Sequence, residues 1–196
     1  EAGKKEMRLV PVDLNRFAFV CGDYFYSACS TKGVDFSVSR DGKPLLKDGE
    51  PLWVMGEVDS LEKIIFNYLS NALKYTPEED EIELGLERAG ESARIFVRDT
   101  GMGISEEGQK KLFAVFSQVD ETTTRDYEGT GLGLALAKSL TEDMDGEVGV
   151  TSQVGRGSTF WVTFPICKAP ENPEDIDIEV KRWLVADDMG QTGLDD

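Results

Sequence analysis

The sequence predicts an α+β domain, because segments with helical spacing are interspersed with shorter strand-like segments. Apolar residues recur every three or four positions in residues 12–32, 59–75 and 131–145, as in amphipathic helices. Strand-like patterns occupy residues 34–39, 52–56, 81–87, 93–99, 147–152 and 158–164. The 196 residues suit one domain of ordinary size with a tail.

Composition narrows the classes of function. The net charge of −17 argues against binding to nucleic acid or to an anionic membrane. No apolar run approaches the roughly 18 residues that a membrane span requires. Three cysteines without CxxC spacing indicate reduced thiols, and therefore a cytoplasmic location. The absence of histidine excludes a histidine-based triad and a phosphohistidine within these residues.

The first two predicted helices have recognisable ends. Asp13 is the expected N-cap of the first helix, and Gly33 is its expected stop. In the second helix, Asp59 with Glu62 resembles a capping box. The apolar sides of both helices are expected to face the core.

The polar side of the second helix is the first candidate site. Asn67, Asn71 and Lys74 share this side, which is either a solvated surface or a ligand site. Asparagine is a mediocre helix former, so two on one face are unusual. An amide oxygen suits Mg²⁺, and a lysine one turn later could meet a phosphate.

The second candidate site lies at the end of the hairpin of residues 81–87 and 93–99. Asp99 is followed by Gly101 and Gly103, and it could accept a hydrogen bond from a ligand amino group. The alternative is an ordinary turn aspartate. Ser105 is expected to begin a short helix that is closed by Phe113 and Phe116.

A glycine-rich segment precedes the third helix. Gly129, Gly131 and Gly133 alternate, which lets backbone N–H groups approach an anion at a helix start. This pattern predicts a phosphate site, although a plain turn has the same composition. Gly146 is the expected C′ residue of the helix.

These segments, in this order, resemble the catalytic ATP-binding domain of bacterial sensor histidine kinases. The matching motifs are NYLSNALKYTP from Asn67, DTGMGI from Asp99, KLF with Phe116, GTGLGL from Gly129, and GRGSTF from Gly155. The superfamily also includes gyrase, mismatch-repair and heat-shock chaperone ATPases. The resemblance implies the Bergerat fold, a two-layer sandwich with a mixed sheet packed on three main helices.

The resemblance also implies roles for individual residues. Asn71 is expected to hold Mg²⁺, Lys74 to contact phosphates and Asp99 to accept a hydrogen bond from the adenine amino group. Residues 117–128 are expected to form a lid over the phosphates, and Arg125 is expected to be a cation of that lid. The expected nucleotide contacts are Asn71, Lys74, Tyr75, Asp99, Gly101, Gly103, Ile104, Phe113, Gly129, Thr130, Gly131, Leu132, Gly133, Leu134 and Thr159.

The residues expected to act in catalysis are Asn67, Lys74 and Arg125. ATP-hydrolysing relatives carry a glutamate where this chain has Asn67, and an amide is not an efficient general base. Direct hydrolysis is therefore expected to be slow. The resemblance implies transfer from ATP–Mg²⁺ to a histidine on a separate helical hairpin, with a response-regulator receiver domain as a further partner. The alternatives are a nucleotide-binding pseudokinase module and a serine-directed kinase of the anti-sigma-factor type.

Three regions are expected along the chain. Residues 1–12 resemble the junction after the acceptor hairpin, residues 13–167 form the ATP-binding domain, and residues 168–196 form an acidic linker. The segment 182–188 resembles the first strand of a receiver domain, with a chance pair of aspartates as the alternative. Glu128 stands where the family often has glycine, beside the expected phosphates.

Overall fold

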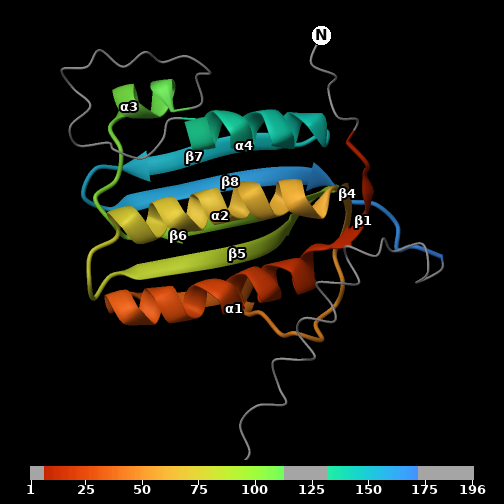
Figure 1. Ribbon diagram of the computed structural model, residues 1–196, viewed down its shortest axis with the longest axis horizontal. Coiled ribbons are helices and arrows are strands. Elements are labelled where there is room, and N and C mark those ends of the chain that lie inside the picture. The colour runs from red at the N-terminus through yellow and green to blue at the C-terminus, as the bar shows by residue number, and fades with distance from the viewer. Residues whose placement is uncertain (1–6, 113–131, 172–196) are drawn as a thin grey trace, which may run out of the picture.

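The computed structural model describes residues 7–112 and 132–171, which form a mixed sheet with helices on one face (Figure 1). The six strands have the order β3 (Lys43–Pro44), β2 (Asp35–Arg40), β5 (Glu81–Ala89), β6 (Ser92–Asp99), β8 (Gly157–Pro165) and β7 (Glu147–Gln153). Among the strands in the described residues, only β2 and β5 are paired in parallel. Helices α1 (Leu14–Lys32), α2 (Val58–Tyr75) and α4 (Leu132–Asp143) cover the face seen in Figure 1. This arrangement confirms the predicted two-layer sandwich with three main helices.

Three short elements complete the described chain. Strand β1 (Val10–Asp13) pairs antiparallel with β4 (Trp53–Gly56), apart from the main sheet. Helix α3 (Glu106–Lys111) begins at Ser105, whose hydroxyl accepts a hydrogen bond from the Gly108 N–H at 3.2 Å. Strands β1 and β3 were not predicted from the sequence, because such short strands depend on distant pairing partners.

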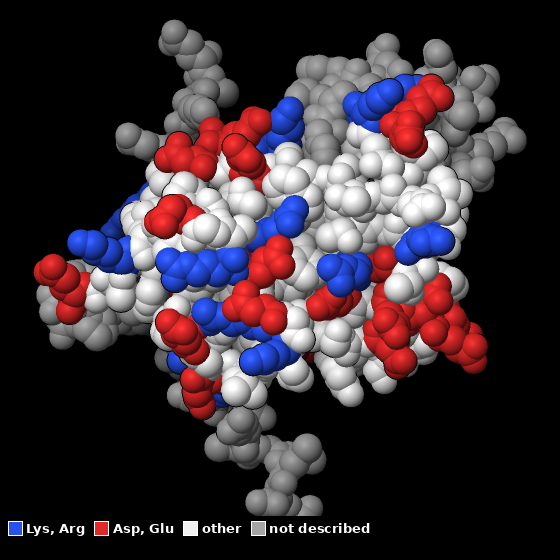
Figure 2. Space-filling model, turned by 180° about the vertical axis from the view of Figure 1, so that it is seen from behind, with Lys and Arg blue, Asp and Glu red and all other residues white. Residues whose placement is uncertain are grey.

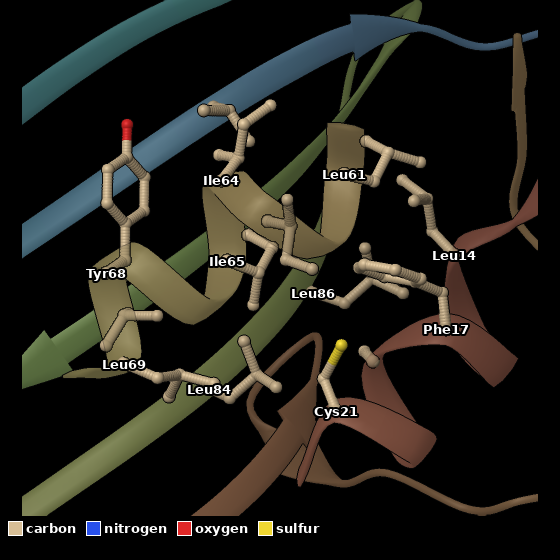
Figure 3. Packing of buried hydrophobic residues seen from close by; sticks show 14 of the residues in the cluster. Leu14, Phe17, Cys21, Leu61, Ile64, Ile65, Tyr68, Leu69, Leu84 and Leu86 are labelled. Carbon is tan, nitrogen blue, oxygen red and sulfur yellow. The ribbon is translucent and has the colours of Figure 1, made fainter. Parts of the chain in front are cut away.

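The core lies between the helices and the sheet. Figure 3 shows Leu61, Ile65 and Leu69 of α2 directed into it, together with Leu84 and Leu86 of β5 and Phe17 of α1. Each of these side chains is at most 5% exposed. The predicted apolar side of α2 is therefore confirmed as the buried side, and its burial fixes the direction of the polar side.

The other face of the sheet is polar (Figure 2). Cross-strand ion pairs join Arg98 to Glu83 at 3.1 Å and Arg94 to Glu87 at 3.2 Å. Arg94 also lies 4.4 Å from the ring centroid of Trp161. Side chains on this face point away from the helices, so they cannot contribute to a site between helix and sheet.

The helix ends confirm some predictions and correct others. Asp13 caps α1 by accepting from the Asn15 N–H, and Gly33 ends it with φ +74°. The N-cap of α2 is Glu57, without a side-chain capping bond, so the predicted Asp59–Glu62 capping box is wrong. Because the helix begins at Val58, Asp59 lies inside its first turn.

The end of α4 also differs from the prediction. The left-handed residue is Asp145, with φ +57°, and the Gly146 N–H donates to the Thr141 carbonyl at 2.9 Å. Gly146 is therefore one position beyond C′. A Cβ on Gly146 would lie 2.5 Å from the Thr163 carbonyl oxygen, so close packing explains this glycine.

Candidate nucleotide-binding site

The polar side of α2 presents two amides to one place. Asn67 and Asn71 are half-buried, and Asn71 Nδ2 donates to Asn67 Oδ1 at 3.4 Å. Among the described residues, Asn71 Oδ1 accepts no hydrogen bond. An amide oxygen in that position is a suitable ligand for a hard cation such as Mg²⁺.

Lys74 and Tyr75 lie at the C-terminal end of the same helix. Lys74 is exposed, with Nζ 5.3 Å from the ring centroid of Tyr75. Lys32 of α1 donates to the Leu73 carbonyl, which satisfies a backbone group at this helix end. The Lys74 side chain is exposed at the end of the polar side of α2, where it could reach a phosphate.

The beginning of α4 lies against these amides. A Cβ built on Gly133 would be 2.1 Å from Asn67 Nδ2, so only glycine fits without movement of the amide. Leu134, by contrast, is 8% exposed and its side chain packs in the core. The structure therefore brings Gly133, the last glycine of the predicted motif, against Asn67, while the neighbouring Leu134 packs in the core.

Asp99 lies at the end of β6 and is 7% exposed. Its Oδ1 accepts from the N–H of Gly101 at 3.0 Å and from that of Ser158 at 3.3 Å. Burial raises the pKa of the Asp99 carboxyl, these two hydrogen bonds lower it, and nearby Asp80 raises it. Among the described residues, no group donates a hydrogen bond to Asp99 Oδ2, which leaves this oxygen as an acceptor for a ligand.

The glycines after Asp99 allow close backbone contacts. A Cβ on Gly101 would lie 2.5 Å from the carbonyl oxygen of Tyr75, at the end of α2. Gly103 has φ +70°, and a Cβ there would lie 2.0 Å from the carbonyl oxygen of Gln153. The loop of residues 100–104 therefore fits between the end of α2 and the β7–β8 hairpin.

Ile104 fixes the end of this loop. Its N–H donates to Ser152 Oγ at 2.8 Å, and its carbonyl accepts from Gln109 Nε2 at 2.9 Å. Gln109 Nε2 also donates to the Ser152 carbonyl at 3.0 Å. These bonds connect the loop after Asp99 to both α3 and β7.

Thr159 is not brought to this site. It pairs with Arg98, and its position on β8 places it on the polar face of the sheet. Ser158 pairs with Asp99, is 7% exposed and shares the helix-covered face with it. Sequence reasoning missed Ser158, although alternation from Phe160 would have placed it on the buried face.

Five further predicted site residues, four nucleotide contacts and the lid cation, lie outside the described residues. These are Phe113, Arg125, Gly129, Thr130 and Gly131. Leu132 is the first residue of α4, and its side chain is not described. Within residues 7–112 and 132–171, no cluster of three or more cysteine, aspartate or glutamate side chains could hold a metal ion. In the same ranges, no helix is long and apolar enough to cross a bilayer.

Comparison with curated proteins finds sensor kinases over much of the chain. Sensor protein GacS of Pseudomonas syringae pv. syringae is 38% identical over 186 residues, covering 89% of this chain and 19% of GacS. The circadian input-output histidine kinase CikA of Synechococcus elongatus is 47% identical over 105 residues, covering 54% of this chain and 14% of CikA. The chain thus spans less than a fifth of the length of these relatives.

Solved structures and a family profile agree with this result. Full-length ShkA in complex with AMPPNP is 27% identical with a TM-score of 0.69, covering 86% of this chain and 33% of ShkA. The catalytic domain of histidine kinase ThkA shares the fold, with a TM-score of 0.66 at 24% identity, covering 81% of this chain and 96% of that domain. Residues 56–168 match the profile described as histidine kinase-, DNA gyrase B-, and HSP90-like ATPase. The chain therefore belongs to the histidine kinase-, DNA gyrase B- and HSP90-like ATPase family.

Proposed function

We propose that this domain binds ATP–Mg²⁺ and donates the γ-phosphoryl group to a histidine on a separate dimerisation hairpin. The observation that carries the proposal is the contact between Asn67 of α2 and Gly133 of α4, beside Asn71. It joins a cation ligand to a helix start that favours anions. The names of GacS and CikA as sensor kinases, and AMPPNP bound to ShkA, support this function.

The described residues fit Mg²⁺ and the nucleotide. Asn71 would hold the ion through Oδ1, because its Nδ2 already donates to Asn67. Lys74 would contact phosphate, and Asp99 would accept a hydrogen bond from the adenine amino group. Bound Mg²⁺ would neutralise charge that develops on the phosphates during transfer.

Asn67 favours transfer over hydrolysis. An amide has no basic site near neutral pH, so it cannot deprotonate an attacking water. Phosphoryl transfer depends mainly on positioning and charge neutralisation, which these side chains can supply. Since the 196 residues contain no histidine, the acceptor must come from outside them. A response-regulator receiver domain would then take the phosphoryl group.

The proposal places the chain in the cytoplasm, in two-component signalling. Cys21 and Cys29 are buried free thiols, as expected in a reducing compartment. We further propose that residues 1–12 join the domain to its acceptor hairpin and that residues 168–196 begin a link toward a receiver domain.

Calorimetry tests the nucleotide and metal assignments. Wild type, Asn71→Ala and the control Ser70→Ala would be titrated with ATP, with and without Mg²⁺; Ser70 is an exposed neighbour on α2. Mg²⁺ should strengthen ATP binding to wild type and to Ser70→Ala, but not to Asn71→Ala. An unchanged Mg²⁺ effect in Asn71→Ala would overturn the metal assignment.

Labelled ATP tests the transfer. With γ-labelled ATP, the chain should label an added hairpin domain with acid-labile phosphate and should not label itself. ATP binding without any transfer would indicate a pseudokinase module. Acid-stable phosphate on a partner serine would indicate the serine-directed alternative, and acid-labile label on this chain alone would contradict the proposal.

A further inference from the structure

The hydroxyl groups of Ser152 and Ser158 lie between Asp99 and the loop that follows it. Ser152 Oγ is 2.8 Å from the Ile104 N–H nitrogen, 2.9 Å from the Gly157 carbonyl oxygen and 2.8 Å from Ser158 Oγ. Ser158 in turn donates its backbone N–H to Asp99 Oδ1 at 3.3 Å. Ser152 is half-buried on β7, and Ser158 is 7% exposed on β8.

Counting hydrogens fixes the direction of these bonds. A serine hydroxyl has one hydrogen to donate and two lone pairs. Ser152 must accept from the Ile104 N–H and must use its own hydrogen to reach the Gly157 carbonyl, which is only an acceptor. The contact between the two hydroxyls is then a hydrogen bond only if Ser158 is the donor. All three contacts are satisfied in this single arrangement.

The Ser158 hydroxyl therefore acts as a hydrogen-bond acceptor toward a ligand. Its only hydroxyl hydrogen is committed to Ser152, so toward the site it offers lone pairs alone. Ser158 is directly opposite Asp99 in the antiparallel pair, on the same face, where paired Cβ atoms are about 4.5–5.5 Å apart. The side chains of Asp99 and Ser158 therefore form two neighbouring acceptors.

We infer that Ser152 is a positioning residue that sets base selectivity by holding Ser158 as a hydrogen-bond acceptor. This inference rests on the proposed ATP function. Two acceptors suit an exocyclic amino group, or a water that donates to Ser158 and to an unprotonated ring nitrogen. A 6-oxo purine has a carbonyl oxygen in place of the amino group and a ring N–H, so it would oppose both arrangements.

The same bonds connect base recognition to helix α3. Ser152 receives the Ile104 N–H, and Gln109 of α3 holds the carbonyls of both Ile104 and Ser152. The loop after Asp99 is consequently tied to β7 on one side and to α3 on the other. Loss of the Ser152 hydroxyl should affect the base end of the nucleotide without changing the amides that face the phosphates.

Ser152→Ala tests the inference by calorimetry with ADP and with inosine diphosphate, both with Mg²⁺. Without its acceptor, Ser158 is free to turn its hydrogen toward the ligand. The dissociation constant for inosine diphosphate divided by that for ADP should therefore fall roughly three- to tenfold relative to wild type. Ser152→Thr retains a hydroxyl and should restore the ratio. Thr151→Ala, an exposed neighbour on the polar face, is the matched control and should leave the ratio unchanged.

Binding by wild type tests the proposed function, and the change in preference on substitution tests the role of Ser152. If wild type binds neither nucleotide, the proposed function fails. If wild type prefers ADP and folded Ser152→Ala keeps the same preference, the positioning role is overturned while the function stands. If Ser152→Ala does not fold, Ser158→Ala replaces it. A preference for ADP that Ser158→Ala leaves unchanged would equally overturn the inference.

Discussion

The amide of Asn67 lies so close to the backbone of Gly133 that a Cβ on the glycine would be 2.1 Å from Nδ2. These residues are 66 positions apart in the sequence, and the contact joins the polar side of α2 to the start of α4. The contact places the start of α4 beside the two amides of α2 that are proposed to serve the metal and the phosphates.

Gly133→Ala should weaken nucleotide binding without unfolding the domain. The methyl group would displace the Asn67 amide, and with it the hydrogen bond from Asn71, while alanine favours the helix by up to about 1 kcal/mol. We expect the dissociation constant for ATP–Mg²⁺ to rise roughly tenfold, about 1.4 kcal/mol. Calorimetry and thermal unfolding would measure both effects, with Ser139→Ala on the exposed side of α4 as control. Unchanged binding would show that the Asn67 position is unimportant.

Gly157→Ala should destabilise the fold far more than Gly155→Ala. Gly157 has φ +96°, and a Cβ there would lie 1.9 Å from the Asp99 carbonyl oxygen. Gly155 has φ +76° but no atom within 4 Å of such a Cβ. Urea unfolding should show a loss of roughly 2–4 kcal/mol for Gly157→Ala and about 1 kcal/mol for Gly155→Ala. Equal losses would mean that the contact with Asp99 is easily relieved.

Asp99→Asn should lower the affinity for ADP without lowering the stability of the fold at neutral pH. Burial raises the pKa of the Asp99 carboxyl, so the folded state binds its proton more readily than the unfolded state. The stability that this proton contributes is fully present below the pKa of the carboxyl in the unfolded chain, about 3.9. It is lost as the pH rises through the higher pKa of Asp99 in the folded state. At neutral pH the asparagine variant should therefore be at least as stable as wild type, and this difference should shrink on acidification. Its affinity for ADP should nevertheless be lower, because a charged acceptor is lost.

The measurement for Asp99 is urea unfolding over a series of pH values, with nucleotide titration at neutral pH. Asp35→Asn removes one negative charge from an exposed position on β2 and is the control for net charge. If wild type gained no stability relative to Asp99→Asn as the pH was lowered, the effect of burial on this carboxyl would be refuted.

Tyr68→Phe should stabilise the domain. Tyr68 is 1% exposed, its ring lies 5.5 Å from that of Phe160, and its hydroxyl has no hydrogen-bond partner among the described residues. Figure 3 shows the hydroxyl directed away from the Leu84 and Leu86 side of the core. Removing a buried hydroxyl without a partner should increase the free energy of unfolding by about 1 kcal/mol. A decrease in stability, or weaker ATP binding, would reveal a partner for that hydroxyl.

Much of this architecture was predictable from local sequence patterns. The three main helices and the principal strands followed from apolar periodicity, and Asp13, Gly33 and Ser105 followed from capping chemistry. Strands β1 and β3 were not predictable, because their few residues become strands only by pairing with distant segments. The Asp59 capping box failed because the helix starts at Val58, one residue before it.

The sequence by itself determined which chemical groups the site has: two amides on one side of α2, a carboxylate at the end of β6, and a glycine in the first turn of α4. Only the tertiary structure decided which of these groups meet. Strand register placed Ser158 beside Asp99 and Thr159 on the opposite face, since neighbouring residues in a strand point to opposite sides. The packing of α4 on α2 brought Gly133 to Asn67, a contact between distant segments that no local pattern can specify.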